Sequence, residues 1–144
     1  MTVTARAFFY IQQIEQLTRR RIDECLQPEG ITAGQYMVLS LVAHQEPISS
    51  ADLARRANMT AQSMGEFIKT LETKGLVERR ACPKSRRTNL ILSTPTGRKT
   101  LVHAESKVDN AEREFFSCLS TEDIANLRFQ LSRVRHAELE RLKN

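Results

Sequence analysis

Apolar residues recur through most of this chain at the three- and four-residue spacing of α-helices. In the N-terminal part this spacing predicts a helix over about residues 5–26. The run Gln27-Pro28-Glu29-Gly30 ends the pattern, because proline and glycine do not easily continue a helix. Thr32 followed three residues later by Gln35 has the composition of a capping box, which predicts that a second helix begins there.

The middle of the chain changes from short helices to short strands. Ser49 and Thr60 are capping residues in front of amphipathic stretches, which predicts a third and a fourth helix. Lys74-Gly75 suits the end of the fourth helix, since glycine readily adopts the left-handed conformation found there. Residues 76–80 and 90–92 have the pattern of strands, and a polar, basic turn joins them. A hairpin that follows a helix pair is the order of elements in a winged helix-turn-helix.

Two long helices are predicted for the rest of the chain. Thr94-Pro95 opens the first, because a capping residue followed by proline is typical of a helix start. Its apolar residues follow at alternating spacings of three and four, the period of a coiled-coil seam. They are Leu101, Ala104, Val108, Ala111, Phe115 and Cys118. Ser120 with Asp123 predicts the start of the second helix, again through a capping box.

The terminal helices carry more apolar surface than the small central module can cover. We therefore expect terminal helices of two chains to pack together in a homodimer, since exposed apolar seams seldom remain unpaired. Folding back of these helices onto the chain's own centre is the alternative. The residues expected at the dimer interface are Phe8, Ile11, Val108, Phe115, Leu127, Leu131 and Val134.

The predicted fold is mainly α with a small β-hairpin wing, a winged helix-turn-helix with N- and C-terminal dimerisation helices. Residues 1–31 are expected to form the N-terminal dimerisation helix and residues 98–144 the C-terminal ones. Residues 32–97 would form the winged module between them. A chain of 144 residues fits this organisation as one compact domain.

The positive charge of the chain is concentrated in the central module. The formal net charge is +5, and the stretch between Pro47 and Thr100 contains eleven basic and four acidic side chains. The rest of the chain contains eleven basic and thirteen acidic side chains. A basic centre with nearly neutral flanks is typical of a nucleic-acid-binding module. A solvated charged surface is the alternative explanation of the same residues.

The sequence shows no sign of a membrane segment or of export. No apolar run approaches the roughly 18 residues that span a bilayer, and the N-terminus has no signal-peptide core or cleavage site. The three cysteines are widely spaced and do not make a disulfide framework in a chain of this size. We therefore expect a cytoplasmic protein that has no membrane partner.

A helix-turn-helix that binds double-stranded DNA needs a helix whose first side chains are short and polar enough to meet base edges. The segment Thr60-Ala61-Gln62-Ser63 meets this need, and Gln62 can pair with adenine through two hydrogen bonds. Amides at the starts of the third and fourth helices suit phosphates. Arg86 and Arg87, expected at the hairpin tip, can enter a narrow minor groove. The residues expected to contact DNA are Ser49, Ser50, Thr60, Ala61, Gln62, Ser63, Glu66, Lys69, Arg80, Lys84, Arg86 and Arg87.

Residues 32–97 resemble the winged helix-turn-helix of MarR-type transcriptional regulators. The matching segments are Ile48-Ser49-Ser50-Ala51-Asp52-Leu53-Ala54, Leu71-Glu72-Thr73-Lys74-Gly75-Leu76-Val77-Glu78-Arg79, Arg86-Arg87 and Leu92-Ser93-Thr94-Pro95-Thr96-Gly97. The flanking helices match the family plan in order and length, so the resemblance covers nearly the whole chain. It implies a dimeric regulator, often a repressor, on a pseudo-palindromic operator. It also implies release by a small aromatic or anionic effector, with no cofactor.

Two positions differ from the family pattern. The family's wing usually has an aspartate two residues before its minor-groove arginine, whereas here Ser85 precedes Arg87 and brings no charge to orient it. The family's recognition helix commonly has a hydroxyl residue and an arginine where this chain has Gly65 and Glu66. Glu66 would repel phosphate but can accept a hydrogen bond from the amino group of cytosine. The preferred DNA sequence is therefore expected to depart from the family's common pattern.

Sensor chemistry has one candidate in the sequence. Some MarR-type regulators sense oxidants through a cysteine on the first helix, and Cys25 stands near the end of that helix beside Arg21. Cys25 is a candidate redox sensor, with a small buried core residue as the alternative. Cys118 is expected in the apolar seam and Cys82 on the exposed wing. No close spacing of histidines and cysteines indicates a metal site, so no metal is expected.

Other functions compete with DNA binding. A helical dimeric protein could use its basic face to bind acidic partners without operator specificity. RNA binding is a third hypothesis, but aromatic residues are few and none alternates with the basic hairpin residues to stack bases. The sequence has neither a nucleophile elbow nor a phosphate-binding loop, so an enzyme is not expected.

Overall fold

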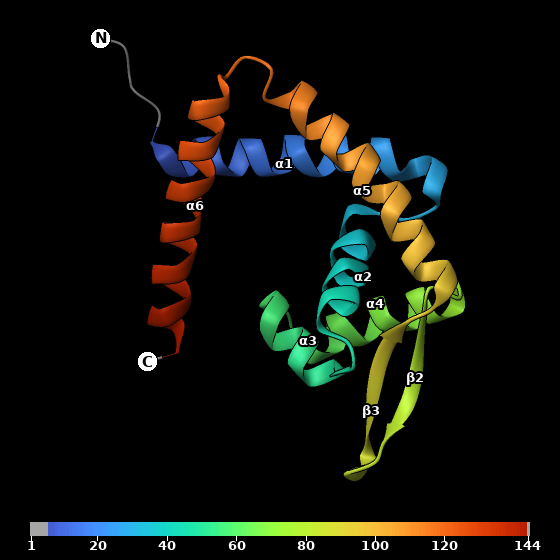
Figure 1. Ribbon diagram of the computed structural model, residues 1–144. Helices are drawn as coiled ribbons and strands as arrows, with labels where there is room; N and C mark the ends of the chain where they lie inside the picture. The colour runs from blue at the N-terminus through green and yellow to red at the C-terminus, as the bar shows by residue number, and fades with distance from the viewer. Residues whose placement is uncertain (1–5, 144) are drawn as a thin grey trace. The chain divides into compact units, whose positions relative to one another are not determined.

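The structure, a computed structural model that describes residues 6–143, confirms the predicted fold class (Figure 1). Over these residues the α-helices are α1 (Ala7–Leu26), α2 (Ala33–Gln45), α3 (Ser50–Ala57), α4 (Ala61–Thr73), α5 (Pro95–Phe115) and α6 (Thr121–Leu142). A short 3-10 helix, η1, covers Gln27–Glu29, and the strands are β1 (Ile48–Ser49), β2 (Val77–Cys82) and β3 (Ser85–Ser93). The chain divides into two compact units, one up to Asp109 and one from Asn110 onwards.

The predicted helix starts are confirmed by their capping bonds. The Thr32 hydroxyl accepts from the Gln35 amide and the Gln35 side chain accepts from the Thr32 amide, both at 3.2 Å, so the capping box of α2 is complete. Ser120 and Asp123 form the same reciprocal arrangement in front of α6. These bonds satisfy amides that would otherwise have no partner in the first turn of each helix.

A residue in the left-handed backbone conformation ends each helix of the central pair, α3 and α4. At the end of α4, Gly75 has a φ of +70°, and the Leu76 amide donates back to the Leu71 carbonyl at 2.9 Å. At the end of α3, Asn58 has a φ of +52°, and the Met59 amide donates back to Ala54 at 2.9 Å. Asparagine tolerates this conformation better than most residues, so Asn58 turns the chain from α3 into α4 within three residues.

A three-stranded antiparallel sheet, in the order β1-β3-β2, replaces the simple hairpin that the sequence predicts. The additional strand β1 pairs Ile48 with Ile91, and both side chains are buried. The two longer strands extend further toward the turn than predicted, so that only Pro83 and Lys84 remain in it. Arg86 and Arg87, expected in the turn at the tip, instead lie in the first residues of β3 directly after the turn and so remain near the free end of the hairpin.

One apolar core joins the helices and the sheet of the first unit. Leu39 on α2, Leu53 on α3 and Ile68 on α4 are completely buried together with Ile91 on the central strand. Residues of the predicted terminal segments also belong to this core, namely Leu26 on α1 and Leu101 and Ala104 on α5. At roughly 1.5–3 kcal/mol for each large side chain that is fully buried, this core holds α3, α4 and the sheet in fixed positions.

The hairpin is attached to the helices by a polar network at the end of β3. Ser93 is the buried polar residue here, and the Glu46 carboxylate accepts from both its amide at 2.5 Å and its hydroxyl at 2.7 Å. Arg98 on α5 donates to the Ser93 carbonyl at 2.7 Å. The network therefore connects the end of α2, the end of β3 and the first turns of α5.

The start of α5 also lies directly against the start of the hairpin. The Thr94 amide donates to the Leu76 carbonyl at 3.1 Å, and the Thr94 hydroxyl donates to the Gly75 carbonyl at 2.6 Å. Gly97 is buried, and a Cβ atom at this position would overlap the Leu76 carbonyl oxygen. Only glycine permits this approach of the two backbones.

Gly97→Ala is expected to lower the free energy of unfolding by about 1–3 kcal/mol, because the added methyl group forces the two backbones apart. Urea denaturation followed by circular dichroism measures this change. Gly65→Ala is the matched control, since a Cβ at Gly65 meets no atom within 4 Å. That variant should instead gain roughly 0.5–1 kcal/mol, as alanine is the better helix former. Equal stabilities of the two variants would contradict the close approach at Gly97.

Candidate nucleic-acid interface

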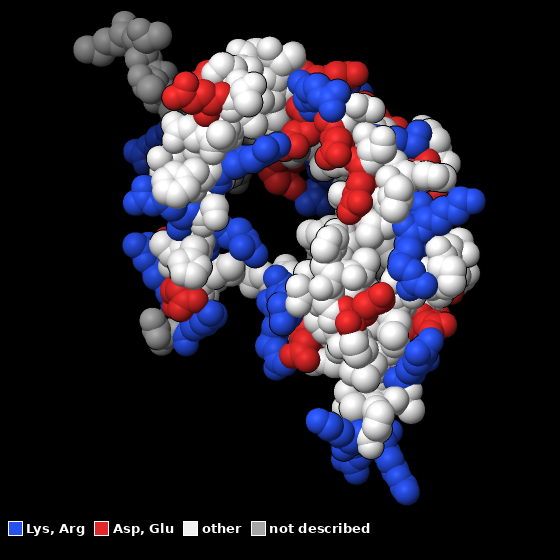
Figure 2. Space-filling view, viewed as in Figure 1, with Lys and Arg blue, Asp and Glu red and all other residues white. Residues whose placement is uncertain are grey.

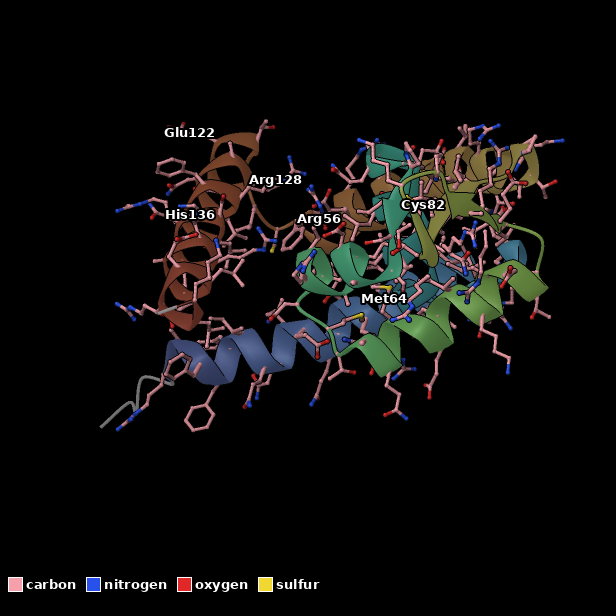
Figure 3. The ribbon with its side chains drawn as sticks, turned by 90° about the horizontal axis from the view of Figure 1, so that it is seen from below. Arg56, Met64, Cys82, Glu122, Arg128 and His136 are labelled. Carbon is pink, nitrogen blue, oxygen red and sulfur yellow. The ribbon has the colours of Figure 1, made fainter. Side chains whose placement is uncertain are left out.

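Helix α4 has one buried and one exposed face. Met64, Ile68 and Leu71 are fully buried (Met64 is labelled in Figure 3) and anchor the helix to the core. The opposite face carries the side chains predicted to meet DNA, and all of them are exposed: Ala61, Gln62, Ser63, Glu66 and Lys69. The structure thus brings these predicted residues together on one side of a rigid helix.

The hydroxyl of Thr60 makes its hydrogen bonds within the chain. It accepts from the Ser63 amide at 3.1 Å as the cap of α4, and it donates to the Ser63 hydroxyl at 3.0 Å. The Ser63 hydroxyl keeps its own hydrogen and can donate it to an outside acceptor. Thr60 therefore positions the start of α4, and Ser63 presents the available polar atom; a base contact by either remains a prediction.

The start of α3 has a negative charge of its own. The Ser49 hydroxyl accepts from the Asp52 amide at 3.1 Å and donates to the Asp52 carboxylate at 2.9 Å. Arg55 also donates to this carboxylate, and the bonds from Arg55 and then Ser49 lower the pKa of Asp52. Asp52 consequently stays ionised beside the amides of Ser50 and Ala51, which makes this helix start a weaker phosphate site than the start of α4.

The end of the hairpin is the most strongly basic feature of the first unit. Figure 2 shows Lys and Arg side chains gathered at its free end, and Lys84, Arg86 and Arg87 are all exposed there. The β2–β3 register shifts beyond the pair Ala81–Asn89, so both arginines lie in an irregular part of β3. We call Lys84, Arg86 and Arg87 the wing cluster.

Ser85 makes its side-chain bond away from Arg87. Its hydroxyl accepts from the Thr88 hydroxyl at 3.2 Å, and within residues 6–143 no hydrogen bond joins Ser85 to Arg87. The carboxylate that the MarR resemblance implies at this position is therefore not replaced by an equivalent contact. The Arg87 side chain is left to adjust to its partner.

Several other cations of the module are occupied by contacts within the chain. Lys74, at the end of α4, donates to the Gly30 carbonyl at 2.6 Å and to Gln35 at 2.8 Å, so it joins α4 to the start of α2. Arg79 pairs with Glu72 at 3.0 Å, and Arg80 pairs with Glu78 at 2.6 Å. Exposed pairs of this kind are weak, so Arg80 remains able to move to a phosphate.

The residues predicted for dimerisation differ in exposure. Phe8 and Ile11 on α1 are 80% and 50% exposed, next to exposed Phe9, Tyr10 and Leu17. In the second unit Leu131 and Val134 on α6 are exposed, whereas Leu127 and Phe115 are partly buried. Val108 packs partly against the core of the first unit, so only part of its surface is available for a partner chain.

The second unit has contacts of its own. Arg128 on α6 pairs with Glu112 near the end of α5 at 2.9 Å, and the rings of Phe115 and Phe116 meet edge to face with centroids 5.0 Å apart. Cys118 lies beyond the end of α5 and is exposed, so its expected place in the apolar seam is wrong. The helix ends three residues earlier than the seam pattern suggests.

Cys25 lies in an environment that disfavours the reactive thiolate. It is half-buried, and its thiol donates to the Ile22 carbonyl at 3.2 Å. Burial raises the pKa of Cys25 although Lys107 and Arg21 oppose the change. Among the residues that the structure describes, no three His, Cys, Asp or Glu side chains are grouped as metal ligands. No helix in the described part of the chain is long and apolar enough to cross a membrane.

Iodoacetamide is expected to alkylate Cys118 well before Cys25, because Cys118 is exposed whereas burial keeps Cys25 in its protonated form. As pH rises, the thiolate of Cys25 should appear only above the ordinary pKa of a thiol. Mass spectrometry of peptides from a timed reaction measures both rates, with half-buried Cys82 as an internal reference. Equal rates at Cys25 and Cys118 would contradict the protected environment and would favour the redox role.

Comparison with known protein families identifies the central module. The MarR family model matches residues 31–88, which include α2, α3, α4, β2 and the wing cluster. A putative transcriptional regulatory protein for the hcr operon of Thauera aromatica is 30% identical over 112 residues. The matched region covers 78% of this chain and 68% of that protein.

Solved structures agree with the fold over nearly the whole chain. An Escherichia coli MarR mutant complexed with operator DNA is 25% identical, with a TM-score of 0.81, and the match covers 87% of this chain and 90% of that one. The Mycobacterium tuberculosis MarR family protein Rv2887 complexed with salicylic acid is also 25% identical, with a TM-score of 0.74 and coverage of 93% and 99%. This chain belongs to the MarR family of transcriptional regulators.

Proposed function

We propose that the protein binds double-stranded operator DNA as a homodimer and represses transcription until a small effector releases it. The observation that carries this proposal is the pairing of two exposed features on one rigid unit. These are the polar face of α4 and the wing cluster. Figure 1 shows α4 and the projecting hairpin that carry them. A helix that enters the major groove and a basic hairpin that reaches the neighbouring minor groove are the contacts of a winged helix-turn-helix.

Each feature has a separate role in this proposal. Gln62 and Ser63, in the first turn of α4, contact base edges in the major groove. The amides at the start of α4 and the side chain of Lys69 hold the phosphate backbone. Arg87 enters the minor groove, while Lys84 and Arg86 add positive charge near the phosphates.

A homodimer follows from the apolar side chains that the single chain leaves exposed. The row from Phe8 to Leu17 on α1 and the pair Leu131 and Val134 on α6 are large apolar surfaces of the kind that partner chains cover. Proteins of the MarR family are dimers. Two copies related by a two-fold axis place two α4 helices on one duplex, which requires two half-sites of a pseudo-palindrome.

The effector belongs to the same proposal. The relative Rv2887 is known in complex with salicylic acid, which supports a small aromatic carboxylate as the class of effector for this chain. A regulator of this kind acts in the cytoplasm, where bacterial chromosomal DNA is found. Regulation of transcription requires no catalytic residue, and we propose no enzymatic activity.

Duplex DNA from upstream of the protein's own gene is expected to bind with an affinity that falls steeply with salt. If each dimer neutralises about six to ten phosphates, the affinity should fall by about 10³- to 10⁵-fold between roughly 50 and 200 mM salt. Fluorescence anisotropy of labelled duplex measures this slope. An affinity that does not change with salt, or preference for an acidic protein over duplex, would contradict DNA as the partner.

Arg87→Ala is expected to weaken operator binding by about 1–3 kcal/mol, because the minor groove loses its guanidinium. Arg87→Lys should recover only part of that loss, since an ammonium restores the charge but not the planar fork. Arg113→Ala on α5 removes the same charge outside the winged module and is the matched control. Unchanged anisotropy titrations for Arg87→Ala would remove Arg87 from the interface.

A further inference from the structure

The exposed face of α4 carries a carboxylate without a cationic partner. Of the two glutamates on this helix, Glu72 pairs with Arg79 at 3.0 Å. Within residues 6–143 no ion pair or hydrogen bond engages the carboxylate of Glu66, which is exposed, although Lys69 stands three residues further along the helix. The Thr70 hydroxyl donates to the backbone carbonyl of Glu66 at 3.0 Å and leaves the carboxylate free. Glu66 lies four residues after Gln62, so both side chains point to the same side of α4.

A free carboxylate on this face has a restricted set of favourable contacts with DNA. It is repelled by every phosphate, and it can only accept hydrogen bonds. In the major groove, guanine presents acceptors at N7 and O6 and thymine an acceptor at O4, and these repel it too. The only base groups that can donate a hydrogen bond to the carboxylate in the major groove are the amino groups of cytosine and adenine. Adenine also presents its N7 acceptor beside the amino group, so cytosine is the base that suits a carboxylate best.

We propose that Glu66 selects a cytosine in each half-site of the operator, an inference that rests on the proposed function. Four residues of α-helix span about 6 Å, and successive bases of a strand are about 3.4 Å apart along the duplex. By this rise, the base that contacts Glu66 lies within about two base pairs of the base that contacts Gln62. Glu66 acts as a determinant of sequence preference rather than of overall affinity.

The local backbone supports a close contact at this point. Gly65 precedes Glu66, and the space that its Cβ would occupy is open. Because glycine has no side chain, this position adds no steric bulk beside Glu66 in the proposed contact with the duplex.

Selection of duplexes from a randomised library tests this assignment directly. The wild-type protein, Glu66→Gln, Glu66→Ala and the control Glu122→Gln would each select from the same library, followed by sequencing and by anisotropy on the preferred duplex. Glu122 is an exposed carboxylate on α6 (Figure 3), so its variant makes the same change of charge outside the winged module. Circular dichroism confirms that each variant is folded.

The wild type and Glu122→Gln should share one cytosine per half-site, and replacing that base should weaken wild-type binding by roughly 5- to 150-fold. Glu66→Ala should lose the preference at that position only and should bind mismatched duplexes more tightly. Glu66→Gln should change the preference toward adenine, because an amide can both donate and accept.

Two negative results have different meanings. If the wild type enriches a motif and both Glu66 variants keep the same base at every position, Glu66 is not a specificity determinant, while the proposed function stands. If the wild type enriches no sequence at all, the proposed function fails and the inference about Glu66 fails with it.

Discussion

The spacing between α4 and the hairpin, which we propose contact the major and the minor groove of DNA, depends on one junction, at Leu76. Its amide closes α4 through the bond to Leu71, and its carbonyl accepts from Thr94 at the start of α5. The side chain is buried in the core, and Gly97 lets α5 lie against its backbone. A single residue thereby ends α4, leads into the hairpin and receives α5, the long helix that leads out of the module. Any shift there would change the angle between α4 and the hairpin, and with it the angle between the two proposed DNA contacts.

The polar side chains of the module divide into those that build it and those that it presents. Thr60, Ser49 and Lys74 have their polar atoms satisfied inside the chain, and each holds a helix end in place. Gln62, Glu66 and the wing cluster have no such structural use within the described residues. This division matters because a group that is already hydrogen-bonded loses that bond when it contacts DNA, whereas a free group loses only water. In the proposed complex the presented set therefore contributes most of the contacts with DNA.

Local signals in the sequence predict most of the fold because they act over a few residues. The capping residues Thr32, Thr60 and Ser120 begin helices where expected, and Gly75 ends α4. The exposed face of α4 follows from helical periodicity alone. The seam pattern, however, continues past the end of α5 to Cys118, because periodicity does not mark where a helix stops. Asn58 carried a usable signal, since asparagine is prone to the left-handed conformation that turns α3 into α4.

Long-range contacts explain what the sequence did not reveal. Strand β1 is only two residues long, too short for any periodicity, and it exists because Ile48 pairs with Ile91, 43 positions later. The Glu46–Ser93–Arg98 network and the contacts of Lys74 likewise join residues that are distant in sequence. Arg86 and Arg87 were displaced from the turn because the hairpin register, which shifts after Ala81, depends on both strands together.

If Glu66 contacts DNA as proposed, its carboxylate, which has no ion-pair partner among residues 6–143, alters the balance between affinity and specificity. Non-specific binding comes almost entirely from phosphates, so a negative charge on the interface weakens it at every site on the chromosome. At a site that offers a cytosine amino group, part of this loss is recovered by a charge-assisted hydrogen bond. The ratio of specific to non-specific affinity therefore rises even while both affinities fall. Because a regulator competes against a very large number of non-specific sites, this ratio decides how fully its operator is occupied. The strongly basic wing cluster can supply the affinity that Glu66 removes, which explains how one module carries both charges.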